Sequence, residues 1–365
     1  MASFNGQLRS NEIFSALYNM IISQEVFADN LGAHQTLVDK ARVDGGLFGD
    51  TKCYYSTDVL KSAPWGNDAE AANLLALHRP DAPKCQAIHL DQFRQICLTV
   101  DNYLSKRAWA TEGAFSSFNG VMLGWMRETK RVYDGTLYNV YIGTTVSPKA
   151  AQTREIAVKG LTDAKEEAMI IAQGLADLMV EMGDYSREFN DNEFLRSYAK
   201  EGIKVIWNSK FVNKIKKIDL PTIFHKDGLV DKFEEDILPA RYFGNVVAAA
   251  VTAEANDGHY RSLVEMDIGA GSGTASAGTK LQHVFPGDLI PAGVAIQAGT
   301  AYEEDADIIC KVLVKLPPYM SAFEVGTSFF NPKSLTESHF LTFGHNTIEY
   351  LENYPFITVK ATEVE

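Results

Sequence analysis

Residues 105–134 read SKRAWATEGAFSSFNGVMLGWMRETKRVYD, and this stretch decides the fold. Apolar and small side chains recur in it at steps of three and four residues, the spacing that places side chains on one face of an α-helix. We therefore predict one long amphipathic helix here, with one face that packs on a core. That face carries Ala108, Thr111, Phe115, Phe118, Met122, Trp125, Thr129 and Val132.

The opposite face of this predicted helix carries three glycines, Gly113, Gly120 and Gly124, next to Ser116 and Ser117. Glycine inside a helix costs roughly 0.5–1 kcal/mol relative to alanine, so three glycines on one face call for a reason. One interpretation is tight packing inside the chain, and the other is close contact with another molecule. In both, the three glycines form a close-packing face.

Basic residues gather at both ends of the predicted helix. Lysine and arginine side chains attract phosphate groups at short range, even on a protein whose total charge is negative. These residues are therefore candidates for a local basic face. They are Lys106, Arg107, Arg127, Lys130 and Arg131.

The composition is that of a globular protein with more than one structural unit. The chain has 365 residues, of which 46% are hydrophobic and 22% charged, enough to fill a core. The net charge of −13 argues against non-specific nucleic-acid binding over the whole surface. The start of the chain lacks the basic and apolar regions of a signal peptide, and no stretch approaches ~18 uninterrupted apolar residues, so we expect a cytoplasm-like compartment and no membrane segment.

The four cysteines are widely spaced and contain no C-x-x-C pair. This usage predicts reduced, partly buried thiols and argues against a zinc site. The cysteines are Cys53, Cys85, Cys97 and Cys310.

The first hundred residues predict an arm followed by a long hairpin. Ser10 is a suitable cap for a short helix that ends before Gly32. Residues 43–101 are broken by glycine and proline, with strand-like stretches at 51–57 and 88–100. So long an excursion with few apolar anchors predicts that it packs on a neighbour; a small independent subdomain is the alternative.

The rest of the chain predicts a mixed α/β unit and then a β-rich region. In the α/β unit, strands and helices alternate. Residues 243–316 then contain short β-type runs punctuated by glycine and proline, with no helix, and the closing strand follows at 355–360. We predict strands at 137–146, 153–158 and 203–207, and helices at 162–182 and 210–217.

The strongest sign of enzymatic chemistry is the sequence VEMDIGAGSG at 264–273. It resembles the first motif of the S-adenosylmethionine-dependent methyltransferases, in which the glycine turn leads into a helix that approaches the cofactor. Here Gly278 and Pro286 stand where that helix should run, which favours a plain hairpin loop. A methyltransferase that uses residues 267–273 is kept as an alternative. Residues 273–280 imitate a phosphate-binding loop, but Thr279 precedes Lys280, the reverse of the required order.

Other catalytic and metal-binding patterns are missing from the sequence. It contains no G-x-S-x-G elbow and no H-E-x-x-H pair, and His339 and His345 are the closest histidines. The acidic runs at 234–236 and 303–305 are typical of solvated surfaces. We predict no catalytic residue, no cofactor and no metal site.

The order of parts resembles a known family of proteins. An arm, a long hairpin, a long helix, an α/β unit and a returning final strand follow one another as in the major capsid proteins of tailed double-stranded-DNA bacteriophages with the Hong Kong 97-type fold. The amino-acid sequence is similar to those of the smaller capsid proteins of short-tailed phages. The segments that carry the resemblance are 4–6 with 14–18, 205–208 with Phe211 and 214–215, 286–293, 329–333 and 353–359.

The resemblance implies an α+β fold, a structural function and several partners. It implies an N-terminal arm at 1–42, an extended loop at 43–102, a peripheral domain at 103–149 with the spine helix, an axial domain at 150–318 with a glycine-rich β insertion, and a return to the peripheral domain at 319–365. It also implies a non-enzymatic protein that assembles in the host cytoplasm into hexamers, pentamers and finally the virion shell. Expected partners are scaffolding and portal proteins and packaged double-stranded DNA, which the five basic residues at the ends of the predicted helix would face. An encapsulin-like compartment protein, which shares this fold, is a further alternative.

Overall fold

The computed structural model describes residues 36–44, 51–62, 79–101, 112–216, 234–249, 266–268, 282–284 and 299–364. They form two compact units. The chain passes from one unit to the other within strand β3 (Lys84–Asp101) and within helix α5 (Glu112–Thr144), so neither unit is one continuous segment. None of the helices in this described part is long and apolar enough to cross a membrane.

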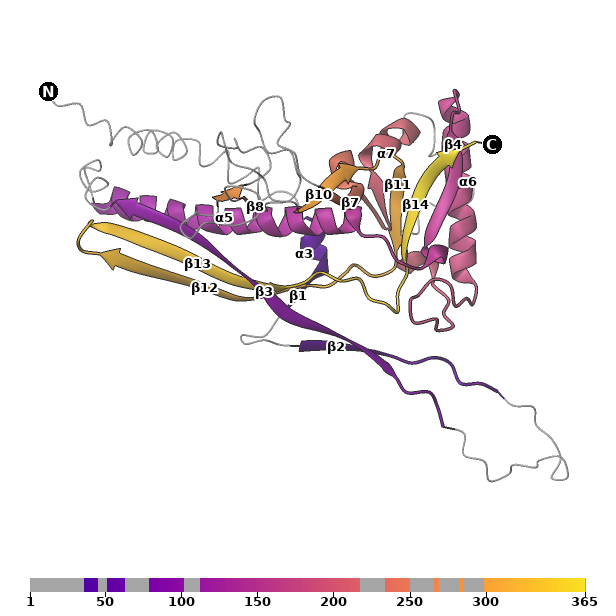
Figure 1. Cartoon of the computed structure of the whole chain (residues 1–365), viewed down its shortest axis with the longest axis horizontal. Coiled ribbons are helices and arrows are strands. Elements are labelled where there is room, and N and C mark those ends of the chain that lie inside the picture. The colour runs from indigo at the N-terminus through magenta and orange to yellow at the C-terminus, as the bar shows by residue number, and fades with distance from the viewer. Residues whose placement is uncertain are drawn as a thin grey trace. The chain divides into compact units, whose positions relative to one another are not determined.

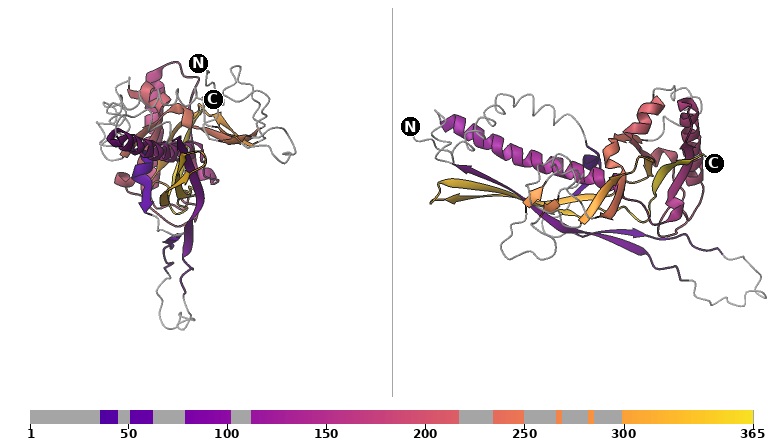
Figure 2. Two further views of the ribbon diagram at one scale, coloured as in Figure 1. Left: turned by 90° about the vertical axis from the view of Figure 1, so that its left-hand side faces the viewer. Right: turned by 45° about the horizontal axis from the view of Figure 1, so that its top comes forward.

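The first unit is built on long strands. β12 (Tyr319–Asn331) and β13 (Thr336–Asn346) form an antiparallel hairpin, and the other edge of β13 pairs antiparallel with β3. Figures 1 and 2 show β12 and β13 side by side along their whole length. On the far edge of β12, the short strand β1 (Arg42–Asp44) pairs in parallel, directly after helix α3 (Leu37–Ala41).

The second unit is centred on a mixed five-stranded sheet in the order β4-β14-β11-β5-β6. All six residues of β11 (Ile308–Leu313) are buried, as expected for a central strand covered on both faces. It runs antiparallel to both of its neighbours, whereas the outer pairs of strands are parallel. The other strands are β4 (Thr153–Lys159), β5 (Lys204–Asn208), β6 (Glu234–Leu238) and β14 (Phe356–Glu363).

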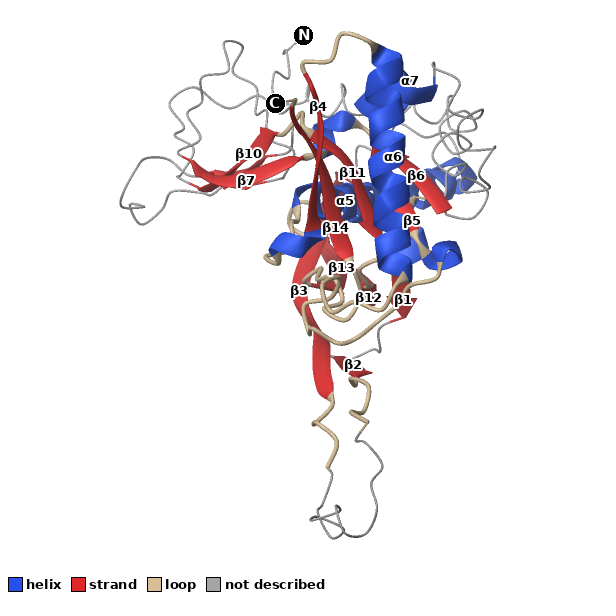
Figure 3. Ribbon diagram, turned by 90° about the vertical axis from the view of Figure 1, so that its right-hand side faces the viewer, coloured by secondary structure: helices blue, strands red, loops and turns tan. Residues whose placement is uncertain are grey.

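Helix α6 (Ala164–Gly183) covers one face of this sheet (Figure 3). The Asp163 carboxylate caps it by accepting a hydrogen bond from the Lys165 backbone N–H at 2.9 Å, and acidic residues in the first turn suit the positive end of the helix dipole. Leu175 and Leu178 of the helix pack in one cluster with Val312 of β11. Burial of such side chains contributes about 1.5–3 kcal/mol each.

Smaller elements complete the second unit. Helix α7 (Ser209–Lys216) follows β5 directly. In the β-rich region two antiparallel pairs are described. These are β7 (Gly244–Ala249) with β10 (Gly299–Glu304), and β8 (Met266–Ile268) with β9 (Gln282–Val284). Strand β2 (Thr51–Ser56) adjoins β3 in the strand order.

Most of the predicted regular elements are confirmed. The predicted strands at 51–57, 88–100, 153–158, 203–207 and 355–360 correspond to β2, β3, β4, β5 and β14. The predicted helices at 162–182 and 210–217 correspond to α6 and α7. The N-terminal helix expected after Ser10, and the start of the helix expected at 105–111, lie outside the described residues.

Two predictions are corrected. The strand expected at 137–146 is wrong, because α5 continues to Thr144; Tyr138 and Tyr141, side chains that favour strands, are held in the helix by tertiary hydrogen bonds to Pro317 and Tyr350. The prediction of partly buried thiols is wrong for Cys53, Cys85 and Cys97, which are exposed, whereas Cys310 is fully buried. The domain bounds implied by the resemblance stay a prediction; in the structure, β14 pairs with β4 and β11, and residues 348–364 lie in the second compact unit and 319–347 in the first.

Candidate functional site

The hairpin of the first unit exposes large aromatic side chains on both of its faces. Phe329 and Phe330 are consecutive in β12, so their side chains point to opposite faces of the strand. They are 62% and 47% exposed, and Phe93 on β3 is 58% exposed. We call residues 325–330 together with Phe93 the exposed strand surface. Such a surface is unusual for a monomer and typical of an interaction site.

Helix α5 turns inward a different face from the one that its apolar pattern predicts. Trp125 and Val132 are 44% and 55% exposed, whereas Met126, Lys130 and Asp134 are buried. The three buried residues are spaced four apart and so share one face of the helix. The predicted apolar face is therefore wrong over residues 125–132.

The two buried charges are held by partners from distant parts of the chain. The Tyr319 hydroxyl donates to the Asp134 carboxylate at 2.6 Å, and the Lys130 ammonium lies 3.6 Å from the same carboxylate. Lys130 also lies 3.2 Å from the Glu324 carboxylate and 5.4 Å from the centroid of the Phe343 ring. Burial and then the charge of Asp134 raise the pKa of Tyr319 far above its ordinary value, so the hydroxyl remains a donor.

His345 lies next to this cluster. Its ring stacks on Tyr319 with centroids 5.6 Å apart, its Nε2 lies 2.9 Å from the Tyr133 hydroxyl, and its Nδ1 lies 2.9 Å from the Asn346 carbonyl oxygen. Burial lowers the pKa of His345, which favours the neutral ring. In the neutral ring Nδ1–H donates to the carbonyl and Nε2 accepts from Tyr133, so both nitrogens are satisfied.

A cavity of about 420 Å³ lies against the buried charges. Four basic and three acidic side chains line it, so the carboxylates offset most of its positive charge. This balance makes it a site of ion pairing more than a strong anion site. The lining residues are Asp39, Arg42, Arg127, Lys130, Arg131, Asp134 and Glu324.

The structure separates the five basic residues that the sequence grouped together. Arg127 is exposed and Arg131 is half-buried. Lys130 is only 5% exposed and is paired with two carboxylates, an arrangement that does not favour the prediction that it faces DNA. Lys106 and Arg107 lie outside the described residues.

The glycine face of α5 is open where it is described. Gly113 and Gly120 lie in the part of α5 whose side-chain surroundings are not described. No atom of the described chain comes within 4 Å of a Cβ built at Gly124, so none of the described residues packs tightly against this position. Contact with another molecule remains a prediction.

A close approach occurs at another glycine of α5, Gly143, where a Cβ would overlap the carbonyl oxygen of Tyr242. Sequence reasoning missed this position, because its partner lies about a hundred residues away.

The base of the β2–β3 hairpin is fastened to the second unit, of which it is a part. The Asp58 carboxylate accepts hydrogen bonds from the Leu195 backbone N–H at 2.9 Å and from the Arg187 guanidinium at 2.7 Å. The hydrogen bond from Leu195 and then that from Arg187 lower the pKa of Asp58 to about 2. On the other strand, the Gln86 amide donates to the Tyr350 carbonyl at 3.0 Å. We call these contacts the hairpin clamp.

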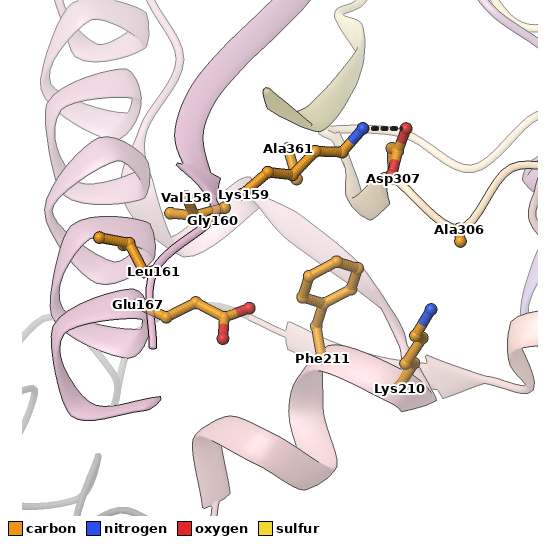
Figure 4. Close-up of a pocket in the computed structure, with 10 residues that line it drawn as sticks. All are labelled: Val158, Lys159, Gly160, Leu161, Glu167, Lys210, Phe211, Ala306, Asp307 and Ala361. Carbon is orange, nitrogen blue, oxygen red and sulfur yellow. Dashed lines mark hydrogen bonds and ion pairs between the residues drawn. The ribbon is translucent and has the colours of Figure 1, made fainter. Parts of the chain in front are cut away.

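A smaller cavity of about 220 Å³ lies in the second unit (Figure 4). The Lys159 ammonium and the Asp307 carboxylate form an ion pair at 2.5 Å on its wall, with Phe211 facing it. The hydrogen bond to Asp307 raises the pKa of Lys159, so the amine stays charged. None of the ten lining residues is a serine, cysteine or histidine, so the cavity does not pair a nucleophile with a histidine base.

The glycine-rich sequence at 264–273 begins in a hairpin. β8 contains Asp267 and pairs antiparallel with β9, whereas a methyltransferase cofactor loop joins a parallel strand to a helix. This pairing confirms the hairpin interpretation and contradicts the methyltransferase alternative. Residues 269–281 lie outside the described part of the chain.

Within the described residues, no group of three histidine, cysteine or acidic side chains is arranged to hold a metal ion. His339 and His345 both lie in β13. His339 Nε2 is 4.0 Å from the Glu337 carboxylate, and His345 is held in the contacts given above.

No family model matches this sequence, and no curated protein matches it. Solved structures do. A chain in the capsid structure of Staphylococcus phage Andhra is 11% identical, with a TM-score of 0.59 over 90% of this chain and 85% of that chain. A chain in the structure of the head fiber and inner core protein of native bacteriophage P68 is 10% identical, with a TM-score of 0.56 over 89% of this chain and 84% of that chain.

These likenesses establish the fold. The chain has the mixed α+β fold of the Hong Kong 97-like phage capsid structures, and the resemblance read from its sequence is confirmed at that level. Because the identities are so low, the likeness extends over the arrangement of the elements and not over individual side chains.

Proposed function

We propose that this protein is the major capsid protein of a tailed double-stranded-DNA bacteriophage, and that its copies form the shell of the virion. The observation that carries the proposal is the exposed strand surface on a chain with a capsid fold. Phe329 and Phe330 are exposed on opposite faces of one strand, so the described chain covers neither face of β12 at these two residues. Neighbouring copies in a shell supply the missing cover.

The parts of the chain have the functions that the fold implies. Residues 1–42 are the N-terminal arm and residues 43–102 the extended loop, which reaches over an adjacent subunit. Residues 103–149 belong to the peripheral domain with α5 as its spine helix, together with the returning hairpin at 319–347. Residues 150–318, joined by the closing strand β14, are the axial domain. The hairpin clamp supports this proposal, because it holds the base of the extended loop in a fixed direction.

The assembly that follows from these parts is a closed shell of hexamers and pentamers, with scaffolding and portal proteins as further partners. The protein acts by geometry and performs no catalysis. Its acidic total charge keeps the shell from condensing on the DNA it encloses, because like charges repel over about a Debye length.

Arg127 and Arg131 are the described residues that we propose to face packaged DNA, and the same role is proposed for Lys106 and Arg107. The open space at Gly124 supports placing this face of α5 towards the shell interior, since nothing in the described chain covers it. A few arginines give a local and salt-sensitive attraction for phosphates.

Electron microscopy of the purified full-length protein tests the function. We expect closed or partly closed particles under some condition of salt, crowding agent or co-expressed scaffolding protein. The matched variant Phe329→Ser/Phe330→Ser, which removes the exposed aromatics without touching the core, should remain folded by circular dichroism but form fewer particles. Dispersed small species under every condition, for the unmodified protein, would contradict the proposal.

A further inference from the structure

Strand β12 has an open edge over its second half. One edge pairs with β13 without interruption from Val325 to Asn331, whereas on the other edge β1 covers only residues 319–321. No further described strand adjoins β12 (Figure 1). An open edge presents a row of backbone N–H and C=O groups that can pair with a strand of another molecule.

The open edge lacks the features that usually prevent such pairing. Residues 324–330 are all exposed, and no atom of the described chain lies within 4 Å of a Cβ built at Gly326. Edge strands are commonly protected by lysine, proline or a bulge. The bulge of β12 lies before Val325, and Pro332 comes after the strand, so residues 325–331 contain none of the three.

We propose that this edge pairs with the same edge of a second copy of the chain, antiparallel and around a two-fold axis at Thr327. Thr327 is the midpoint of the exposed residues 324–330, so this register pairs the whole exposed stretch with itself. The contact is isologous, because each copy contributes the same residues.

The side chains of the edge are complementary in this register. Val325 of each copy lies opposite Phe329 of the other, and the two Thr327 side chains meet on the axis. Pairs of aromatic with β-branched residues, and of threonine with threonine, are among those that stabilise antiparallel strands. A two-fold axis at Gly326 or Ser328 would lose the pairs of Val325 with Phe329 and leave one end of the exposed stretch without a partner.

The charges also permit this pairing. The whole chain carries a net charge of −13, so two copies repel each other in general. The exposed stretch contains one charged residue, Glu324, which lies opposite Phe330 of the second copy. The two Glu324 carboxylates are then six residues apart along the strand, about 20 Å, which is beyond the Debye length of about 8 Å at physiological salt.

The inference deepens the proposed capsid function and rests on it in one respect. A ladder of seven residues buries much less than the about 1,200–2,000 Å² of a standard interface, so the pair is short-lived between two separate copies. It lasts where other contacts hold the copies together, as in a shell. The test must therefore trap the pair covalently.

Single cysteines in the full-length protein provide that trap. The three exposed cysteines are first removed by Cys53→Ser, Cys85→Ser and Cys97→Ser, and the buried Cys310 is kept. In this background Thr327→Cys should form a disulfide-linked dimer under mild oxidation. Opposed residues have Cα atoms about 4.5–5.5 Å apart, within the about 4.4–6.8 Å that a disulfide needs.

Val325→Cys is the matched control, because it is exposed on the same strand. Its two cysteines would be about 14 Å apart along the paired strands, so the dimer should be lost. Mixing Val325→Cys with a tagged Phe329→Cys should restore it as a mixed dimer. Circular dichroism verifies that each variant is folded, and non-reducing gel electrophoresis measures the dimer.

The outcomes separate this inference from the capsid function. Equal dimer yields from Thr327→Cys and Val325→Cys would overturn the register. Particles in the electron microscope without a Thr327→Cys dimer would overturn the pairing and leave the capsid function standing. The expected dimers from a protein that forms no particles under any condition would support the pairing and count against the capsid function.

Discussion

The Tyr319 hydroxyl donates to the Asp134 carboxylate at 2.6 Å inside the first unit, joining strand β12 to helix α5. Asp134 is 1% exposed, and the neighbouring Lys130 is 5% exposed. A buried pair of opposite charges adds little net stability, but breaking it leaves an uncompensated buried charge that costs about 3–5 kcal/mol. The pair therefore fixes which face of α5 turns inward.

We predict that Asp134→Asn destabilises the first unit by about 3 kcal/mol, because it leaves the Lys130 ammonium buried with the Ser321 hydroxyl and the half-exposed Glu324 carboxylate as partners. Hydrogen exchange of the amides in β13 measures this loss. The double variant Lys130→Met/Asp134→Asn removes both charges and should recover most of the lost stability. Equal exchange rates in the single and double variants would show that the two charges are not coupled.

The glycines of α5 provide a second prediction. Gly143→Ala places a methyl group on the Tyr242 carbonyl oxygen, and this overpacking should lower the free energy of unfolding by about 1–3 kcal/mol. Gly135→Ala is the matched control in the same helix, with no atom of the described chain within 4 Å of the new methyl group. It should stabilise the protein by roughly 0.5–1 kcal/mol. Urea denaturation measures both changes, and a loss in the control as large as that in Gly143→Ala would exclude steric overlap as the cause.

The elements found from the sequence are those with local signals. α6 has an acidic N-cap, acidic residues in its first turn and an apolar face at helical spacing, all within twenty residues or so. The end of α5 has none of these. Tyr138 and Tyr141 favour strands, and what keeps them helical is a bond to Pro317 and another to Tyr350. Contacts with residues about two hundred positions away in the chain do not appear in the local periodicity of the sequence.

The buried charges of α5 were missed for a related reason. Counting apolar residues assigns every lysine and aspartate to the solvent side, which is correct for most helices. Lys130 and Asp134 are four residues apart, a spacing that permits ion pairing, but it says nothing about burial. Their burial depends on Tyr319 and Glu324, which the fold brings from the β12 hairpin.

Lys311 gives a prediction that depends on pH. Its ammonium is fully buried, donates to the Thr145 carbonyl at 2.7 Å and the Thr358 hydroxyl at 2.9 Å, and burial lowers its pKa to about 7. The unfolded chain keeps the ordinary lysine pKa near 10.5. Between these two values the unfolded state binds more protons, so stability rises as the pH is raised from about 7 towards 10.5.

We therefore expect Lys311→Met to stabilise the second unit at pH 7 by a few kcal/mol, since one pKa unit corresponds to about 1.4 kcal/mol and two hydrogen bonds are lost in exchange. The gain should shrink steadily and vanish near pH 10. Urea denaturation at several pH values measures it. Lys165→Met, at an exposed position on α6, should show no such trend. A gain in stability from Lys311→Met that does not change with pH would contradict the explanation that burial lowers the pKa of Lys311.

The hairpin clamp gives a prediction about acid. The pKa of Asp58 is lowered to about 2 by the hydrogen bonds from Leu195 and Arg187, so its contribution is complete above pH 3.8 and is lost as the pH falls through about 2. An asparagine at position 58 carries no negative charge, so it accepts weaker hydrogen bonds from Leu195 and Arg187. We therefore predict that Asp58→Asn makes the amides of residues 51–58 exchange faster at neutral pH. Asp81→Asn, on the exposed segment before β3, is the control and should not change these amides.

The last prediction concerns the proposed DNA-facing residues. Arg127→Glu/Arg131→Glu should leave assembly of empty shells intact but lower the amount of DNA retained per particle, and more strongly as salt is raised, because fewer phosphate contacts remain. The control Lys165→Glu/Lys200→Glu makes the same change in net charge in the second unit. DNA content after nuclease treatment, measured over a range of salt, separates the two variants. Failure of the arginine variant to assemble would identify Arg127 and Arg131 as interface residues. An equal loss of DNA in the control variant would show that the net charge of the protein, and not the position of the arginines, determines how much DNA is retained.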